Sequence, residues 1–116
     1  MKADPRVLIV EDEFLIANAL QLVLQKLGAR VLGPAARVST ALELITGGTP
    51  FDCALLDIRL GDELVYPVAD ELRARGVRFA FVSGYDRSTL PAAYQDATFF
   101  SKVEDPKVLY RWVLEG

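Results

Sequence analysis

Charged and polar side chains follow four apolar runs of the sequence, at the point where each run ends. Glu11 and Asp12 follow the first of these runs, Asp57 and Ser83 follow two others, and Lys102 comes just after the last. Short apolar runs without a polar gap are typical of strands buried on both faces of a parallel sheet. Because the carboxyl ends of such strands open onto one edge of the sheet, we expect these side chains to lie close together.

Three carboxylates in one small site would repel one another. The repulsion is about 1–4 kcal/mol per pair at effective dielectric constants between those of water and a protein surface. A hard divalent cation compensates for it, and oxygen ligands without histidine or cysteine favour Mg²⁺. The same groups suit phosphoryl transfer to a carboxylate, with Asp57 as the nucleophile and with Lys102 and Ser83 holding the phosphoryl oxygens.

Each of these residues also has a structural explanation. Asp57 could cap a helix or carry a solvated charge in a loop. Lys102 could form a surface ion pair of little energy, and Ser83 could close a turn before Gly84. Each explanation is reasonable for one residue alone, but together they require coincidences at four strand ends, which favours a common site.

Five segments have the pattern of buried strands, and helical patterns alternate with them. The strand segments are 6–10, 30–32, 53–56, 77–82 and 97–100. The helical segments are 14–27, 38–45, 65–75, a weak one at 86–95 that Pro91 interrupts, and one that begins after Asp105. The second strand should close at Gly33-Pro34, and residues 58–63 should form a loop. Such alternation predicts a parallel sheet with right-handed crossovers and helices on both faces.

The segment 14–27 is apolar around more of its circumference than a surface helix requires. One face carries Ile16, Leu20, Val23 and Leu27, and a neighbouring face carries Leu15, Ala19 and Leu22. Deeper burial of the helix would explain this pattern, and so would a face on which a partner docks.

The composition indicates one globular domain, residues 1–116, because 52% of the residues are apolar and 25% are charged. A net charge of −3 without a cluster of lysines and arginines argues against nucleic-acid binding. The chain has no histidine, which excludes Ser/His and Cys/His pairs, histidine metal sites and phosphohistidine in this chain.

The remaining signals concern the compartment. The single cysteine, Cys53, lies inside an apolar run and is expected to behave as a small buried hydrophobe. Residues 1–5 lack a signal-peptide pattern, and no apolar run approaches membrane-spanning length. A soluble cytoplasmic protein that does not contact a membrane is therefore the expectation.

The chain resembles the receiver domains of two-component response regulators over nearly its whole length. The motifs that carry the resemblance are Val7-Leu8-Ile9-Val10-Glu11-Asp12-Glu13, Ala54-Leu55-Leu56-Asp57, Phe81-Val82-Ser83-Gly84-Tyr85 and Phe99-Phe100-Ser101-Lys102. The set is specific, although any one motif alone would be weak. The resemblance implies an α/β, flavodoxin-like (βα)₅ fold, a doubly wound parallel sheet of five strands in the order 2-1-3-4-5, here with a short or irregular fourth helix.

The resemblance also implies roles for individual residues. Asp57 would accept a phosphoryl group from a histidine kinase or a histidine phosphotransfer protein. Asp12, Asp57 and the backbone carbonyl of Arg59 would bind Mg²⁺, with Glu11 nearby through water. Ser83 and Phe99 match the pair through which the family couples phosphorylation to conformation. Phe99 lacks a hydroxyl, so a switch would rely on ring packing, and an ordinary core phenylalanine is an equally good explanation of this residue.

The chain departs from the family pattern in two places. Val103 follows the lysine, where receivers usually have proline, often after a cis bond. A non-proline cis bond costs about 2.5–4 kcal/mol, so a trans bond and a reshaped loop are expected. The span from Ser83 to Lys102 is also short. Together with the run 79–85, these features resemble a branch of single-domain receivers with a Phe-Ala-Thr-Gly-like motif, in which partners use other faces, including the first helix.

The leading hypothesis is a stand-alone phospho-receiver, a monomer or weak homodimer that contacts an unknown downstream protein or drains phosphoryl groups from a kinase. It is not an enzyme with an external substrate, although it would assist its own phosphorylation and dephosphorylation. The alternative is a pseudo-receiver, an interaction module that never gains phosphate. A hydrolase of haloacid-dehalogenase type would need Asp-x-Asp, whereas Arg59 stands two residues after Asp57. Because Arg59 and Tyr85 are bulky and could obstruct an attacking water, slow loss of phosphate is expected.

Overall fold

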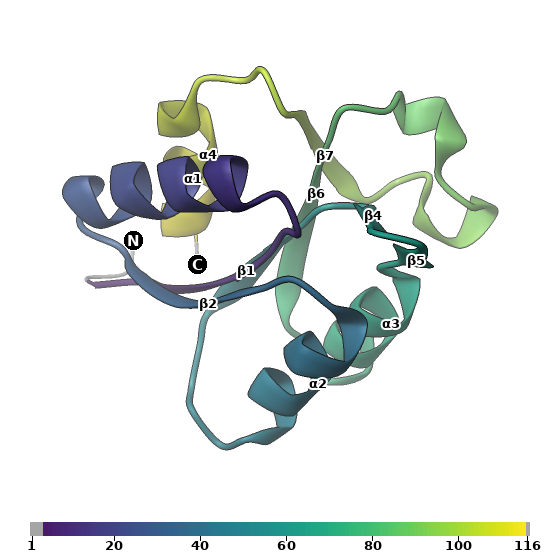
Figure 1. Cartoon of the computed structure of the whole chain (residues 1–116), viewed down its shortest axis with the longest axis horizontal. Coiled ribbons are helices and arrows are strands. Elements are labelled where there is room, and N and C mark those ends of the chain that lie inside the picture. The colour runs from purple at the N-terminus through teal and green to yellow at the C-terminus, as the bar shows by residue number, and fades with distance from the viewer. Residues whose placement is uncertain (1–3, 116) are drawn as a thin grey trace.

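The sheet of the protein has five parallel strands, as seen in a computed structural model that describes residues 4–115 (Figure 1). The strands are β1 (Arg6–Val10), β2 (Arg30–Ala35), β3 (Cys53–Leu56), β6 (Arg78–Ser83) and β7 (Thr98–Ser101), and their order is β2-β1-β3-β6-β7. This order confirms the predicted flavodoxin-like topology 2-1-3-4-5. The ends of the expected domain, residues 1–3 and 116, lie outside the described residues.

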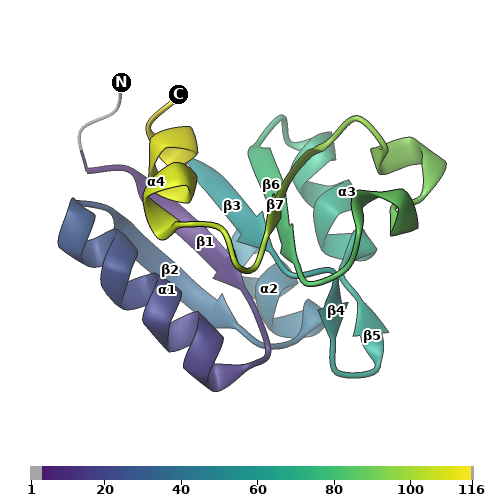
Figure 2. The same cartoon turned by 90° about the horizontal axis from the view of Figure 1, so that it is seen from above.

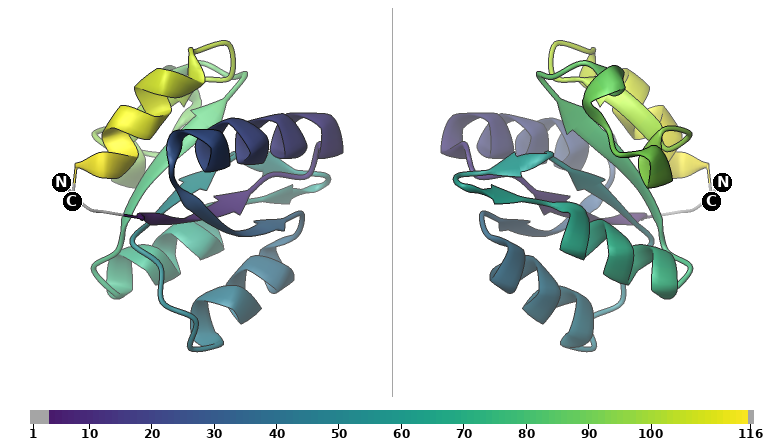
Figure 3. Two further views of the ribbon diagram at one scale, coloured as in Figure 1. Left: turned by 90° about the vertical axis from the view of Figure 1, so that its left-hand side faces the viewer. Right: turned by 90° about the vertical axis from the view of Figure 1, so that its right-hand side faces the viewer.

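Helices cover both faces of the sheet, as predicted (Figure 3). One face carries α1 (Phe14–Leu27) and α4 (Pro106–Leu114), and the other carries α2 (Val38–Thr46) and α3 (Tyr66–Ala74). The central strands β1 and β3 contribute alternate side chains to the apolar cluster on each face, so nearly all of their residues are buried. None of the helices among residues 4–115 is both long enough and apolar enough to cross a membrane.

The residues that bury the first helix are not those of the two apolar faces that its sequence pattern indicates. Its fully buried residues are Ala17 and Leu24, and Gly28 ends it in the left-handed conformation at φ 115°. Leu15 and Leu22, on the neighbouring face, are 79% and 57% exposed. The extra apolar surface of this helix therefore faces solvent, which favours the docking explanation over deeper burial.

Two local predictions were wrong. The second strand does not close at Gly33-Pro34 but continues to Ala35, after a register irregularity between Leu8 and Val10 of β1. Proline has no N–H to donate, and an edge strand tolerates it because no neighbouring strand on the solvent side needs that hydrogen bond. The predicted loop at 58–63 contains a short antiparallel hairpin of β4 (Arg59–Leu60) and β5 (Glu63–Leu64), because the turn at Gly61 lets the chain fold back.

The fourth helix is reduced to two single turns, as predicted. These turns are the 3₁₀ helices η1 (Arg87–Thr89) and η2 (Ala92–Tyr94), and the backbone between them is extended at Leu90 (ψ 142°). Pro91 accounts for the break, because a residue before proline avoids the helical region. Leu90 and Tyr94 are the only residues of the two turns and their link that are buried in the core.

Candidate functional site

The carboxyl ends of β1, β3 and β7 meet at one edge of the sheet (Figure 2). Lys102 Nζ lies 3.0 Å from Glu11 Oε1 and 3.0 Å from Asp57 Oδ2. A third carboxylate oxygen, Glu13 Oε1, lies 3.7 Å from the same nitrogen. The bond after Lys102 is trans, because the one cis peptide among residues 4–115 is Gly33–Pro34. Lys102 therefore reaches Asp57 without the family's proline.

Three carboxylates gather beside this lysine. Glu11, Asp12 and Asp57 each offer an oxygen, and these oxygens lie within 4.8 Å of one another. Glu11 and Asp57 are both only 6% exposed. Buried carboxylates at this range need positive charge, and a set of oxygens without nitrogen or sulfur ligands suits Mg²⁺. The donor set therefore fits the metal that the sequence predicts.

The protonation of the cluster reflects burial and pairing. Burial, followed by the hydrogen bond to Asp57, raises the pKa of Glu11 from 4.5 to about 7. Burial opposes the charge of Lys102, but hydrogen bonds to Glu11 and Asp57 outweigh it and raise the pKa of Lys102 to about 12. The ammonium is thus fully charged at neutral pH and offsets part of the acidic charge.

The β4–β5 hairpin adds a contact to the site that the sequence did not predict. The Gly61 N–H donates to Asp12 Oδ2 at 2.8 Å, and Gly61 has φ +64°. A left-handed turn of this kind favours glycine. The only sequence signal is a glycine four residues after Asp57, and glycines in loops are too common to identify such a contact. The sequence likewise predicts no role for Glu13 at the lysine, although its carboxylate lies 3.7 Å from Lys102 Nζ.

The predicted switch pair lies on the two neighbouring strands β6 and β7. Ser83 is 1% exposed, and its Oγ accepts a hydrogen bond from the Tyr85 N–H at 3.0 Å. Ser83 therefore makes the turn contact that a purely structural role predicts for it. It makes this contact at the edge of the sheet where the site lies. Phe99 is half-buried against the core, and the Arg87 guanidinium carbon lies 5.6 Å from its ring centroid.

A cavity of about 330 Å³ opens at this edge of the sheet. Asp12, Asp57 and Lys102 line it, and so do Arg59 and Tyr85, the two bulky residues expected to obstruct water. Val103 is 92% exposed and points its apolar side chain to solvent next to the site. The backbone carbonyl of Arg59 stays a predicted metal ligand.

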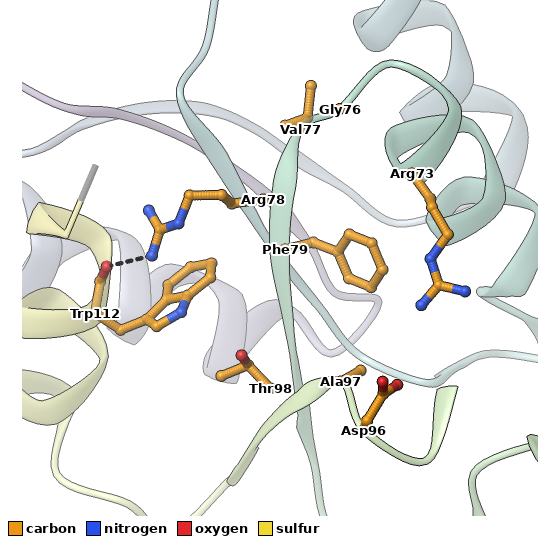
Figure 4. A pocket seen from close by; sticks show the side chains of 9 residues that line it. All are labelled: Arg73, Gly76, Val77, Arg78, Phe79, Asp96, Ala97, Thr98 and Trp112. Carbon is orange, nitrogen blue, oxygen red and sulfur yellow. Dashed lines mark hydrogen bonds between the residues drawn. The ribbon is translucent and has the colours of Figure 1, made fainter. Parts of the chain in front are cut away.

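A larger cavity (Figure 4), of about 440 Å³, lies at the opposite edge of the sheet. It is formed at the start of β6 and β7, between Arg73 of α3 and Trp112 of α4. Arg78 stacks on the Trp112 ring and donates to its carbonyl oxygen at 2.8 Å. This cavity contains none of the predicted site residues, so cavity size does not identify the functional site of this protein.

Several solved structures resemble the chain closely. SdrG from Sphingomonas melonis Fr1 is 33% identical, with a TM-score of 0.81, and the match covers 96% of this chain and 94% of SdrG. A CheY-like response regulator receiver domain protein from Methanospirillum hungatei JF-1 is 26% identical, with a TM-score of 0.81 and coverage of 96% and 91%. The response regulator TrrA from Thermotoga maritima, solved in complex with Mg²⁺-BeF, is 24% identical, with a TM-score of 0.81 and coverage of 94% and 96%. No protein-family model matches the chain, and no curated protein is similar enough to count as a relative.

The sheet order and these likenesses define a CheY-like α/β fold. The chain belongs to the receiver domains of response regulators. The acidic cluster at the carboxyl edge of its sheet is consistent with a phosphoacceptor receiver.

Proposed function

We propose that this chain is a receiver in which Asp57 accepts a phosphoryl group from a histidine kinase or histidine phosphotransfer protein, in a reaction that depends on Mg²⁺. The observation that carries the proposal is the position of Lys102 Nζ, which lies 3.0 Å from a carboxylate oxygen of Glu11 and 3.0 Å from one of Asp57. An ammonium on two buried carboxylates is well placed to hold the oxygens of an incoming anion. The protein would act in the cytoplasm, where such phosphoryl donors act.

In the reaction, an Asp57 carboxylate oxygen attacks the phosphorus atom of the donor. The bond from phosphorus to the donor's imidazole nitrogen breaks, its electron pair returns to that nitrogen, and an acyl phosphate forms on Asp57. Lys102 donates to a phosphoryl oxygen, and the Ser83 hydroxyl turns to donate to another. Mg²⁺ bound by Asp12, Asp57 and the Arg59 carbonyl, with Glu11 nearby through water, would neutralise charge on the attacking and transferred groups. TrrA supports this assignment, since its structure contains Mg²⁺-BeF.

The output of this receiver is protein contact or a phosphate sink, carried by a monomer or weak homodimer. Partners would use the exposed apolar face of α1, where Leu15 and Leu22 face solvent. The reduced fourth helix and Val103 support membership in the branch with a Phe-Ala-Thr-Gly-like motif. The same two features favour the second candidate, a pseudo-receiver that never gains phosphate, whereas the contact of Lys102 with Asp57 favours the phosphoacceptor.

The deciding experiment is incubation with acetyl phosphate and Mg²⁺, followed by intact-mass measurement and peptide mapping. The wild-type protein should gain one phosphoryl group on the peptide that contains Asp57, and Asp57→Asn should gain none. Asp62→Asn is the matched control, because Asp62 is an exposed carboxylate in the nearby hairpin. A wild-type protein that gains no phosphate and has no affinity for Mg²⁺ would select the pseudo-receiver instead.

A further inference from the structure

The segment between β6 and β7, residues 84–97 (Figure 2), is closed on itself by hydrogen bonds from an arginine. Arg87 Nη1 donates to the carbonyl oxygen of Gln95 at 2.9 Å and to that of Ala97 at 2.8 Å. Arg87 thus connects the start of the β6–β7 segment to its end, where the chain enters β7. These are charge-assisted hydrogen bonds, which are stronger than bonds between neutral groups.

The far side of the β6–β7 segment is attached to α3. The Tyr94 hydroxyl donates to Asp70, and the guanidinium of Arg73 lies 4.1 Å from the Tyr94 ring centroid. Arg73 Nη1 also donates to the Ala93 carbonyl oxygen at 3.0 Å. η2 thus has anchors on a helix, while Leu90 is buried in the core and its carbonyl oxygen accepts a hydrogen bond from the Gln95 side chain. Arg87 is the side chain that joins η1 to the entry of β7.

Arg87 also contacts the predicted switch residue. Its guanidinium carbon lies 5.6 Å from the Phe99 ring centroid, within the range of a cation–π contact. Phe99 pairs in register with Phe81 of β6, and it packs on the core cluster that contains Phe81. The arginine therefore contacts Phe99 while it holds the backbone that follows η2.

The other end of the β6–β7 segment is hydrogen-bonded to Ser83. The Tyr85 N–H donates to Ser83 Oγ at 3.0 Å, and Ser83 is buried. If the hydroxyl rotates toward a phosphoryl oxygen, its oxygen moves away from the Tyr85 N–H. The first turn of the segment then loses a contact at the moment when the phosphoryl group arrives.

We propose that Arg87 is a positioning residue that holds Phe99 and the β6–β7 segment in the unphosphorylated arrangement, and that rotation of the Ser83 hydroxyl toward the phosphoryl group releases them. The release rests on the proposed function of Asp57, whereas the hold does not. Since phosphorylation and release of the segment are linked, anything that weakens the hold must favour the phosphoryl-bound arrangement by the same factor.

The hold is tested without any ligand, by amide hydrogen exchange of Arg87→Ala. Exchange within residues 84–97 should rise roughly five- to thirtyfold, the factor that corresponds to the loss of one or two ordinary contacts. Arg111→Ala is the matched control, because Arg111 is an exposed arginine of α4. Unchanged exchange at β1 and β3 verifies that the variant is folded. Equal exchange of 84–97 in wild type and Arg87→Ala would overturn the proposal.

The release is tested with Mg²⁺ and beryllofluoride as the probe. Beryllofluoride should raise exchange of residues 84–97 in the wild type and add little in Arg87→Ala, and Arg87→Ala should bind the probe more tightly by the factor measured without ligand. A wild type that binds the probe with no change in exchange overturns the release. A wild type that takes neither beryllofluoride nor a phosphoryl group overturns the proposed function and the release with it, while the hold is judged on the comparison without ligand.

Discussion

Replacement of Lys102 by methionine should show how much of the site's stability depends on one ammonium group. Methionine keeps the apolar stem of the side chain and removes the positive charge. Its partners Glu11 and Asp57 lie 3.0 Å from Nζ and are both 6% exposed, so they cannot exchange the lost contact for full hydration. We therefore expect the variant to retain the fold with a large deficit in the free energy of unfolding.

The size of the deficit follows from the burial of the carboxylates. Removing one partner of a buried ion pair costs about 3–5 kcal/mol, because the remaining charge stays buried without compensation. A domain of ordinary stability has a free energy of unfolding of about 5–15 kcal/mol, so the variant should still be measurable as a folded protein. Mg²⁺ should recover part of the loss, since a ligand at 100 times its dissociation constant stabilises by about 2.7 kcal/mol.

The deficit should depend on pH through Glu11. The pKa of Glu11 in the fold is about 7, above its ordinary value of 4.5, so ionisation of Glu11 costs stability as the pH rises from 4.5 through 7. Lys102 no longer offsets that cost in the variant. The difference from wild type should thus be largest near pH 8 and should shrink toward pH 5.

The assay is urea unfolding at pH 8 and at pH 5, with and without Mg²⁺, followed by far-UV circular dichroism. Lys107→Met is the matched control, since Lys107 is an exposed lysine of α4. If Lys102→Met at pH 8 is as stable as Lys107→Met, the reasoning that the carboxylates are buried and dependent on this lysine is wrong. A deficit that grows toward pH 5 would contradict the assignment of the raised pKa to Glu11.

Three further predictions concern other parts of the molecule. Phosphorylated wild type should lose its phosphate slowly, because Arg59 and Tyr85 line the cavity at Asp57. Arg59→Ala or Tyr85→Ala should shorten the lifetime of the phosphorylated protein, measured by intact mass. Hydrolysis of the wild type within seconds would refute this. Burial raises the pKa of the Cys53 thiol to about 11, so Cys53 should react with a thiol reagent only after unfolding, and rapid labelling of the folded protein would be the contrary result. Burial and then the hydrogen bond to Asp70 raise the pKa of Tyr94 from 10.0 to about 12, so Tyr94→Phe should lose roughly 1 kcal/mol of stability at pH 7 and less as the pH rises through 12; an equal loss at all pH values would count against the bond.

Much of the fold could be predicted because its signals are local. The apolar run 53–56 indicates a strand buried on both faces, and Asp105 before Pro106 indicates a helix start, which the structure confirms with a 2.9 Å bond from the Lys107 N–H to Asp105. The break at Pro91 likewise follows from the backbone of one residue. The burial of α1 could not be predicted in the same way, because both candidate faces carry several apolar positions and only the packing partner selects Ala17 and Leu24.

The pattern of apolar runs shows which residues follow the strands, and hence that acidic groups and one lysine would share an edge of the sheet. Strand formation and the order of elements along the chain depend on short-range patterns, so they can be read without a partner. Contacts between residues far apart in the sequence are set by the packing of the elements in three dimensions. The Gly61 N–H donates to Asp12, which is 49 residues away in the sequence. Arg87 of η1 likewise contacts the ring of Phe99 on β7. Such contacts depend on the mutual placement of packed elements, which no local pattern of residues encodes.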